Sequence, residues 1–138
     1  DILVIDLPPG TGDIHLTLAQ KVPLSGAVIV STPQDIALID ARKGLEMFRK
    51  VSVPVLGIVE NMSYYCCSNC GHRDDIFGHG GARQESENLN IPFLGEIPLH
   101  AKIREFSDSG TPIVIAEPTS EQSKIFSSMA QQILTGLA

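Results

Sequence analysis

Three cysteines within five residues are the densest group of reactive side chains in the sequence. Cys66, Cys67 and Cys70 lie together, and His72 follows them. The C-x-x-C spacing of Cys67 and Cys70 lets two thiolates face one metal from a tight turn, as in zinc sites and iron–sulfur clusters. An all-cysteine site takes four thiolates, so two arrangements stay open. Either the same pair from a second subunit completes the site, or zinc takes Cys67, Cys70 and His72, with His79 as an optional fourth ligand.

A second group of chemically useful residues begins with a carboxylate after an apolar run. Ile2–Ile5 are four apolar residues, and Asp6 follows them directly, before a turn-rich segment that ends at Asp13. This form is that of a Walker B strand, in which the aspartate holds Mg²⁺ beside the phosphates, usually through water. Gly10 lacks a Cβ, so its N–H can approach a γ-phosphate closely. The pattern predicts a magnesium and phosphate site at the end of this strand.

The loop that cradles phosphates in P-loop proteins is not found in these 138 residues. They contain no G-x-x-x-x-G-K-S/T motif, and the glycine-rich segment Gly78–Gly81 lacks a lysine, so we interpret it as a turn. We therefore expect the 138 residues alone neither to bind ATP tightly nor to hydrolyse it. The sequence starts without methionine, inside an apolar run, which indicates that an upstream part is missing.

Alternating strands and helices are expected to position these residues. Apolar runs bounded by turn residues alternate with segments of helical period. The predicted strands are 2–5, 27–30, 53–59, 93–97 and, as a fifth, 113–116, and the predicted helices are 14–21, 35–50, 82–89, 101–106 and 121–137. Continuous apolar strands of this kind predict an α/β fold, a parallel sheet with helices on both faces. Thr32 is expected to cap helix 35–50, with Pro33 at its first position.

The polar residues at the strand ends indicate where a ligand binds. In parallel sheets, ligands bind beyond the carboxyl ends of the strands. Four predicted strands end at Asp6, at segment 31–34, at Asn61 and at Pro98. These residues are therefore expected along one edge of the sheet. His15 stands at a helix start and is expected on the surface rather than in the site.

Composition limits the classes of protein that fit. The length of 138 residues suits one domain, and 43% apolar with 19% charged residues is typical of a globular chain. The net charge is −6 and no basic run occurs, which argues against a nucleic-acid or membrane partner. No apolar stretch is long enough to span a membrane, and no signal-peptide pattern is present. The clustered odd number of cysteines indicates a reducing compartment.

Five segments together resemble one protein family. They are Asp6–Asp13, Ser31–Ala37, Gly57–Met62, Cys67–Cys70 and Gly95–Leu99. Their sequences closely resemble the Mrp family, ApbC-like P-loop ATPases of the MinD and nitrogenase iron-protein superclass that carry iron–sulfur clusters. The similarity runs nearly end to end and keeps the order of the motifs. It implies that residues 1–138 are a single domain, the C-terminal portion of a P-loop ATPase domain whose N-terminal P-loop part is absent.

The resemblance also implies roles for the residues of the nucleotide site. Asp6 matches the Walker B or switch II carboxylate, a catalytic residue that binds Mg²⁺. Gly10 matches the γ-phosphate sensor and is a catalytic residue too, with Pro9 beside it in the ATP site. Asn61 would recognise adenine, and the loop Pro98–Leu99 would pack against the base.

For the thiols, the resemblance implies that Cys67 and Cys70 bridge a [4Fe–4S] cluster between two subunits of a homodimer. Cys66 lies outside the family pattern. The resulting hypothesis is an ATP-dependent iron–sulfur cluster carrier that uses ATP and Mg²⁺ and passes its cluster to apo-proteins. The expected location is the bacterial cytoplasm, with the mitochondrial matrix as the alternative.

Two other functions stay open on the sequence. The first is a zinc-stabilised structural or adaptor module without turnover. The second is a positioning ATPase of the MinD kind. This one is weaker, because the sequence has no terminal amphipathic basic helix of the membrane-binding type.

Overall fold

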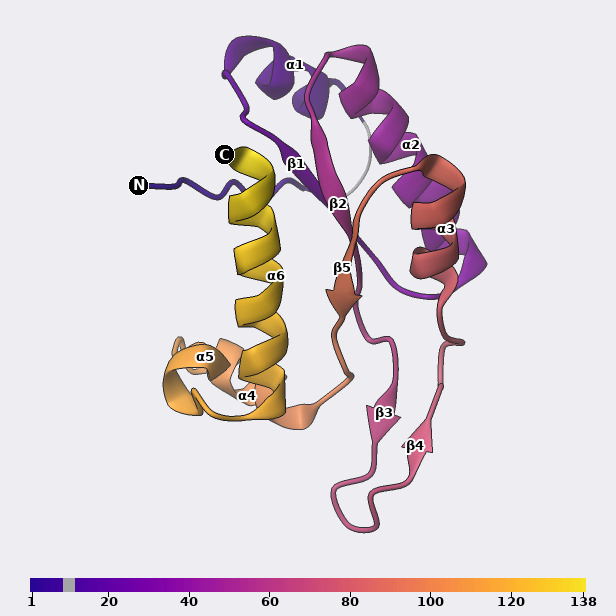
Figure 1. Ribbon diagram of the computed structural model, residues 1–138, viewed down its shortest axis with the longest axis vertical. Coiled ribbons are helices and arrows are strands. Elements are labelled where there is room, and N and C mark those ends of the chain that lie inside the picture. Colours follow the sequence, from indigo (N-terminus) through magenta and orange to yellow (C-terminus); the bar gives the residue numbers. More distant parts are fainter. Residues whose placement is uncertain (9–11) are drawn as a thin grey trace.

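A parallel three-stranded sheet forms the centre of the molecule. The computed structural model describes residues 1–8 and 12–138 (Figure 1). Strands β1 (Ala27–Ser31), β2 (Val55–Glu60) and β5 (Phe93–Glu96) run parallel in the order β1-β2-β5. Two short antiparallel strands, β3 (Tyr65–Cys66) and β4 (Arg73–Asp74), form a separate hairpin. The predicted parallel sheet is confirmed.

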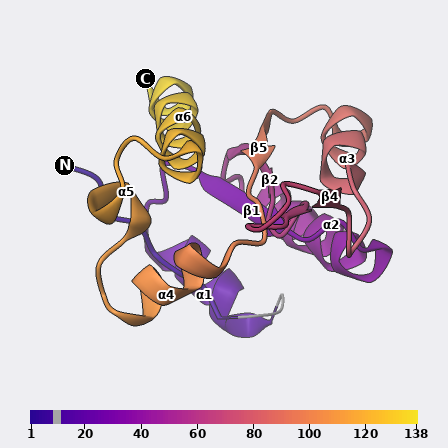
Figure 2. The same cartoon turned by 90° about the horizontal axis from the view of Figure 1, so that it is seen from below.

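Helices cover both faces of this sheet, as the apolar strands require. The helices are α1 (Asp13–Lys21), α2 (Asp35–Lys50), α3 (Gly81–Leu89), α4 (Ala101–Asp108), α5 (Ile113–Ala116) and α6 (Glu121–Leu137). Figure 2 shows α6 on one side of the sheet and α2 with α3 on the other. Among the helices of the described residues, none has the length and apolar character that crossing a bilayer requires.

The alternation of side chains along each strand divides the core in two. Ile29 and Ile58 belong to the cluster packed under α2, and Val59 belongs to the cluster around Met129 of α6. Successive strand residues point to opposite faces, so neighbours such as Ile58 and Val59 enter different clusters. Each buried aliphatic side chain contributes about 1.5–3 kcal/mol to folding relative to exposure.

Two predictions about short apolar runs are wrong. Ile2–Ile5 forms no strand: the segment is extended, and Leu3 and Val4 are each 85% exposed. A strand exists only through its ladder with a neighbour, and an apolar run alone does not supply that neighbour. Segment Ile113–Ala116 is the short helix α5 rather than a fifth strand. A four-residue apolar run fits either state, and here Ser123 Oγ on α6 donates to the Ile113 carbonyl at 3.0 Å.

Two details at helix starts also differ from expectation. Gln34 is the N-cap of α2, without a side-chain cap bond, while Thr32 donates its hydroxyl hydrogen bond to the Gln34 side chain. His15 is not a surface residue: it is 6% exposed, and its Nε2 donates to the Pro8 carbonyl at 2.7 Å. The first turn of α1 therefore packs back on the segment that precedes it, which a helical pattern alone does not reveal.

Candidate functional site

The carboxyl ends of the three parallel strands are tied together by backbone hydrogen bonds. Asn61 N donates to Ser31 O at 2.7 Å, and Ile97 N donates to Glu60 O at 2.8 Å. The Asn61 side chain is half-buried, and its Oδ1 accepts from Met62 N at 3.0 Å. This edge is where a parallel sheet offers a ligand site, because strand ends and loop residues converge there.

The structure brings Asn61 and the Pro98–Leu99 loop into one place. The chain after β2 runs beside the chain after β5, with Ser63 N donating to Ile97 O at 2.9 Å and Leu99 N donating to Tyr64 O at 2.8 Å. Pro98 is buried and Leu99 is half-buried. The chain segments that hold Asn61 and Pro98–Leu99 therefore run side by side at the carboxyl edge of the sheet.

The cysteines lie on the hairpin of β3 and β4, which projects from this edge away from the sheet (Figure 1). Beyond the paired strands, Cys67 N donates to His72 O at 2.9 Å and Gly71 N donates to Cys67 O at 2.8 Å. Gly71 has φ +73°, a left-handed conformation that costs glycine little. We call residues 64–75 the Cys hairpin. Its tip holds the whole Cys67–Cys70 pair in one tight turn.

Within this turn the thiol of Cys67 has a special environment. Backbone N–H groups of Cys70 and then Asn69 donate to its sulfur and lower the pKa of the Cys67 thiol. Metal ions bind the thiolate, so this environment favours the ligand form. Cys67 is half-buried and Cys70 is exposed, so the pair faces outward from the protein.

Cys66 stands apart from that pair. It is exposed on β3, opposite Arg73, whereas Cys67 follows it in the chain and so points to the other side. Its charge acts on Tyr64 instead: burial, and then the neighbouring Cys66, raise the pKa of the Tyr64 hydroxyl. The Arg73 guanidinium lies over the Tyr64 ring at 4.1 Å, at the base of the hairpin.

Sequence reasoning missed Glu60, the last residue of β2. Its carboxylate is fully buried and accepts three hydrogen bonds: from Ser63 Oγ at 2.6 Å, Gly80 N at 3.0 Å and Ala82 N at 2.7 Å. The signal was an acidic residue ending an apolar strand, together with a helix whose N-cap, Gly80, has no capping side chain. Glu60 caps α3 from a distance. It thereby takes up the Gly80 N–H of the glycine-rich turn and the Ala82 N–H of the first turn of α3.

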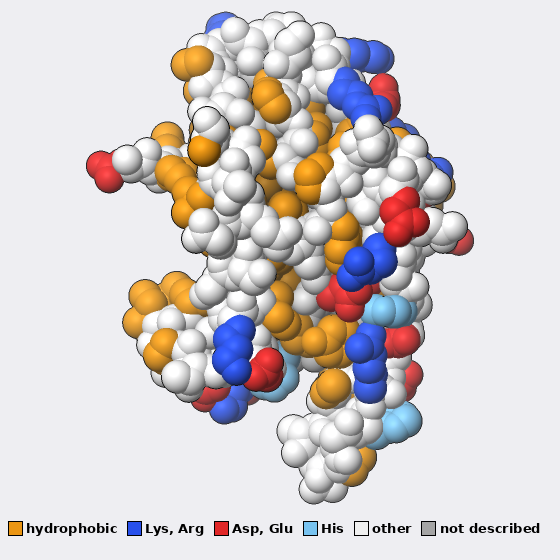
Figure 3. Space-filling model, viewed as in Figure 1, with side chains coloured by type: hydrophobic (Ala, Val, Ile, Leu, Met, Phe, Trp, Pro, Cys, Tyr) orange, Lys and Arg blue, Asp and Glu red, His pale blue; other side chains and the backbone are white. Residues whose placement is uncertain are grey.

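His79 joins this group rather than the cysteines. Its Nδ1 lies 3.1 Å from Ser63 Oγ, and its Nε2 lies 3.9 Å from a carboxylate oxygen of Glu96. The Arg73 guanidinium contacts the same ring at 3.1 Å. These charged and imidazole side chains gather where the Cys hairpin joins the body of the protein (Figure 3). Among the described residues, no group of three or more His, Cys, Asp or Glu side chains is arranged to hold a metal ion.

The sequence of contacts from Glu60 through Ser63 to His79 does not make a nucleophile. The Ser63 hydroxyl has one proton, and it is directed to the Glu60 carboxylate at 2.6 Å rather than to the His79 ring at 3.1 Å, so the ring is not placed to deprotonate Ser63. Ser63 is also fully buried, out of reach of a substrate. A catalytic serine needs the opposite order, with the histidine between serine and carboxylate.

The predicted magnesium and phosphate residues lie in the N-terminal segment. Asp6 is exposed, and no hydrogen bond or ion pair joins it to Asn61 or Pro98 within the described part of the chain. Pro9 and Gly10 lie outside the described residues. The structure therefore brings together the residues predicted for the base, and separately those predicted for the cluster.

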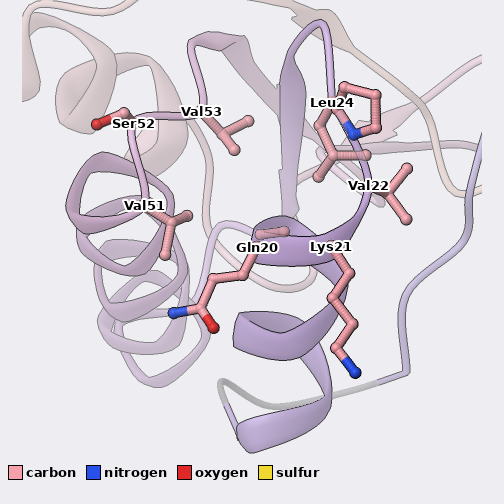
Figure 4. Close-up of a pocket in the computed structure, with 9 residues that line it drawn as sticks. Gln20, Lys21, Val22, Leu24, Val51, Ser52 and Val53 are labelled. Atoms are coloured by element: carbon pink, nitrogen blue, oxygen red, sulfur yellow. The ribbon is translucent and has the colours of Figure 1, made fainter.

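A depression of about 390 Å³ lies at the other end of the sheet and is not part of this site. Figure 4 shows residues from the last turn of α1 and just after it, Gln20 to Leu24, facing Val51 to Val53, which lie between α2 and β2. These residues precede β1 and β2, so they mark the amino ends of the strands. Ligands of parallel sheets bind at the carboxyl ends, where the Cys hairpin and Asn61 are.

Comparison with known proteins identifies relatives of this chain. It is 58% identical over 137 residues to the iron-sulfur cluster carrier protein of Escherichia coli (strain K12), covering 99% of this chain and 37% of that protein. It is 54% identical over 137 residues to the mouse iron-sulfur cluster transfer protein NUBPL, covering 99% of this chain and 43% of that protein. The chain thus spans about two fifths of the length of these relatives.

Solved structures agree with the fold. A nucleotide-binding protein in complex with ADP from Archaeoglobus fulgidus aligns with a TM-score of 0.70 at 41% identity, over 84% of this chain and 46% of that chain. The cell division ATPase MinD of Pyrococcus furiosus aligns with a TM-score of 0.64 at 26% identity, over 80% of this chain and 43% of that chain. The ParA family model, described as NUBPL iron-transfer P-loop NTPase, matches residues 1–134. The resemblance read from the motifs is confirmed, and the chain belongs to this family of iron-transfer P-loop NTPases.

Proposed function

We propose that this chain is the cluster-holding part of an ATP-dependent iron–sulfur carrier. The observation that carries the proposal is the pair of outward-facing thiols, Cys67 and Cys70, on one turn at the tip of a projecting hairpin. Soft thiolate ligands suit iron–sulfur clusters, and an exposed tip suits a cluster that must be handed on. The cluster is the cargo of the protein, delivered to apo-proteins.

The number of thiols favours a homodimer. One chain offers one C-x-x-C pair, whereas a cubane [4Fe–4S] cluster takes four thiolates. Two copies related by a two-fold axis supply four thiolates without any further ligand, provided that the hairpin tips meet on the axis. A projecting tip allows that approach, because the body of each copy stays clear of the axis.

We propose that ATP binds at the carboxyl edge of the sheet. Asn61 and the Pro98–Leu99 loop, which lie together, would hold the adenine base, and Asp6 with Pro9 and Gly10 would serve the Mg²⁺ ion and the γ-phosphate. Mg²⁺ would neutralise phosphate charge, while Asp6 orients it. The 138 residues hold no phosphate cradle, so residues outside them would be needed for hydrolysis. Residues 1–138 would then act as one domain unit, the C-terminal portion of a P-loop ATPase domain.

Support for a reducing compartment comes from the thiols and from the relatives. A plant relative from Arabidopsis thaliana, 52% identical over 137 residues, is named as a mitochondrial iron-sulfur protein required for NADH dehydrogenase, whereas the E. coli relative is bacterial. We propose the bacterial cytoplasm, or else the mitochondrial matrix, as the location. Both keep unligated cysteines reduced.

The two alternative functions have less support. A one-chain zinc site would use Cys67, Cys70 and His72, but the optional fourth ligand, His79, contacts Ser63 instead of the thiols. A MinD-like positioning ATPase would need a free amphipathic terminal helix. Here the apolar side chains of α6, among them Met129, pack on the sheet.

Anaerobic reconstitution of the longer protein tests the carrier. We expect about four irons per dimer, by the ligand logic of four cysteines per cubane. Cys67→Ser or Cys70→Ser should abolish the iron and loosen the dimer, while Cys66→Ser, the matched control one residue away, should leave both intact. Stoichiometric zinc in monomeric protein, lost on His72→Ala, would establish the zinc module instead.

A further inference from the structure

Glu60 is a buried carboxylate that no lysine or arginine pairs with in the part of the chain that the structure describes. Within the described part of the chain, no lysine or arginine nitrogen forms an ion pair with it, and the only titratable donor nearby is His79 Nδ1 at 3.8 Å. Glu85, which is also buried, differs because the Arg42 guanidinium donates two hydrogen bonds to its carboxylate oxygens, at 2.5 and 2.6 Å. Burying a carboxylate is costly unless directed donors satisfy it. Directed hydrogen-bond donors therefore satisfy the buried Glu60 carboxylate. It lies at the N-terminus of α3, where the helix dipole favours an anion.

All three of those hydrogen bonds come from the two ends of the segment that contains the Cys hairpin. Ser63 immediately precedes the hairpin, and Gly80 and Ala82 follow it beyond residues 76–79. Oε1 accepts from Ser63 and Gly80, and Oε2 accepts from Ala82. One side chain thus closes the base of a loop whose tip carries the thiols.

The main chain at the same residue is tied to the sheet. Glu60 O accepts from Ile97 N on one side, and the next amide, Asn61 N, donates to Ser31 O on the other. A continuous set of hydrogen bonds therefore runs from both neighbouring strands, through Glu60, to both ends of the hairpin. Asn61 lies within this set, directly beside Glu60.

We propose that Glu60 is the positioning residue of the Cys hairpin: by holding both ends of the hairpin on the end of β2, it sets where Cys67 and Cys70 stand relative to Asn61. The role of the thiols and of Asn61 in this statement rests on the proposed function. The placement of the hairpin by Glu60 does not, because it follows from the hydrogen bonds alone. A movement at Asn61 would then be passed to the thiols through one side chain.

Two substitutions remove the closure in different ways. Glu60→Gln keeps the size of the side chain but turns one acceptor oxygen into an N–H₂ group, which then faces a backbone N–H of Gly80 or Ala82. Ser63→Ala removes one donor and leaves the cap of α3 in place. Ser123→Ala is the matched control: Ser123 is also buried, and its hydroxyl bonds the Ile113 and Glu117 carbonyls between α5 and α6.

Hydrogen exchange of the full-length protein without cluster measures directly how stably Glu60 holds the base of the Cys hairpin. We expect the amides of residues 64–79 to exchange about tenfold faster in Ser63→Ala and Glu60→Gln, the size of effect that one lost hydrogen bond gives. Ser123→Ala should speed exchange only near α5 and α6. Unchanged exchange of residues 64–79 in Ser63→Ala would overturn the proposal, even if Glu60→Gln fails to fold.

Reconstitution separates positioning from general stability. In Ser63→Ala protein we expect a changed electron paramagnetic resonance spectrum and a lower iron content, whereas Ser123→Ala should show the wild-type spectrum at a similar loss of stability. A normal spectrum together with tenfold faster exchange would also overturn the positioning of the thiols. Failure of the carrier function itself is distinguishable, because it would appear as iron retained in Cys67→Ser.

Discussion

The Cys hairpin and the N-terminal segment 1–8 both carry recognisable motifs, but the structure treats them in opposite ways. The hairpin is mostly polar and exposed, yet its strands pair and a buried carboxylate closes its base. The N-terminal segment is strongly apolar, yet residues 2–5 have no strand partner among the described residues, and Leu3 is 85% exposed. Hydrophobicity therefore does not decide which motif acquires a definite position. Satisfied hydrogen bonds to the rest of the fold decide it.

This contrast bears directly on the candidate site. Asn61, the Pro98–Leu99 loop and the Cys hairpin lie at the same end of the sheet. There, backbone hydrogen bonds join the chain after β2 to the chain after β5. Asp6 lies in the N-terminal segment, where, among the described residues, its neighbour Leu7 packs on the core and Pro8 accepts from His15. The segments that carry Asn61, the Pro98–Leu99 loop and the hairpin thus share backbone hydrogen bonds, whereas no hydrogen bond or ion pair among the described residues joins Asp6 to them.

The largest expected effect concerns packing and compares a leucine of the core with a leucine of the N-terminal segment. Leu45 is 1% exposed in the core under α2, so Leu45→Ala should lower the free energy of unfolding by about 2–5 kcal/mol. Leu3→Ala should change it by less than about 0.5 kcal/mol, because an exposed side chain loses no packing. Urea denaturation of the 138-residue chain measures both. A cost at Leu3 comparable to that at Leu45 would show that residues 2–5 are packed in solution and would break the contrast.

The next effect concerns Asn61, at the carboxyl end of β2, in the longer protein. Asn61→Ala should weaken ATP binding by about 1–3 kcal/mol, the cost of leaving buried polar groups of the base unpaired. Cluster loading should survive, since the hairpin does not depend on the Asn61 side chain. Calorimetric titration with Mg·ATP, beside an iron assay, checks both. Unchanged ATP affinity would leave Asn61 as a residue that merely ends its strand.

A smaller effect concerns the helix that receives the hairpin. Arg42 on α2 grips Glu85 on α3, and this hydrogen bond lowers the pKa of the Glu85 carboxyl. A lowered folded pKa means that the stabilisation is present above the unfolded pKa and is lost as the pH falls through the folded pKa. Glu85→Gln should therefore cost roughly 1 kcal/mol at pH 7, because Arg42 is half exposed and its charge is screened.

The pH dependence of that cost is the decisive measurement. The difference in unfolding free energy between wild type and Glu85→Gln should begin to shrink as the pH falls below about 4.3, the ordinary pKa of a glutamate in the unfolded chain, and should be lost below the lowered pKa of folded Glu85. Lys43→Gln is a fitting control, because Lys43 pairs with Asp40 on the exposed face of the same helix. A pH-independent difference would mean that packing, rather than the ion pair, is what Glu85 contributes.

The smallest effect separates two adjacent thiols. Because N–H groups of Cys70 and Asn69 lower the pKa of the Cys67 thiol, Cys67 should be alkylated by iodoacetamide several-fold faster than Cys66 in apo-protein near pH 7. Mass spectrometry of the modified peptides gives both rates. Equal rates would imply that the tip does not hold its turn in solution, and that the hairpin is no better ordered than the N-terminal segment.

Sequence patterns predicted most of the secondary structure and the grouping of Cys67 with Cys70. Helix α2 lies at Asp35–Lys50 as predicted, and strand β1 extends its prediction by one residue, because apolar period and turn residues act locally. The strand predictions for segments 2–5 and 113–116 were wrong for the same reason. A short apolar run does not specify a strand when its partner must come from elsewhere in the chain.

What the sequence determined by itself was chemical: thiols at the spacing of a metal turn, an amide at the end of a strand, and membership of an iron-transfer P-loop family. Only the tertiary structure decided which of these groups share a location. The chain segments of Asn61 and Pro98–Leu99 lie side by side, His79 contacts Ser63 instead of the thiols, and Glu60 accepts three hydrogen bonds. The physical reason is that, apart from the Ser63–Glu60 hydrogen bond, these contacts join residues 16 to 38 positions apart. Burial of a polar group, unlike helical period or a turn, depends on which distant donors the packed chain brings to it.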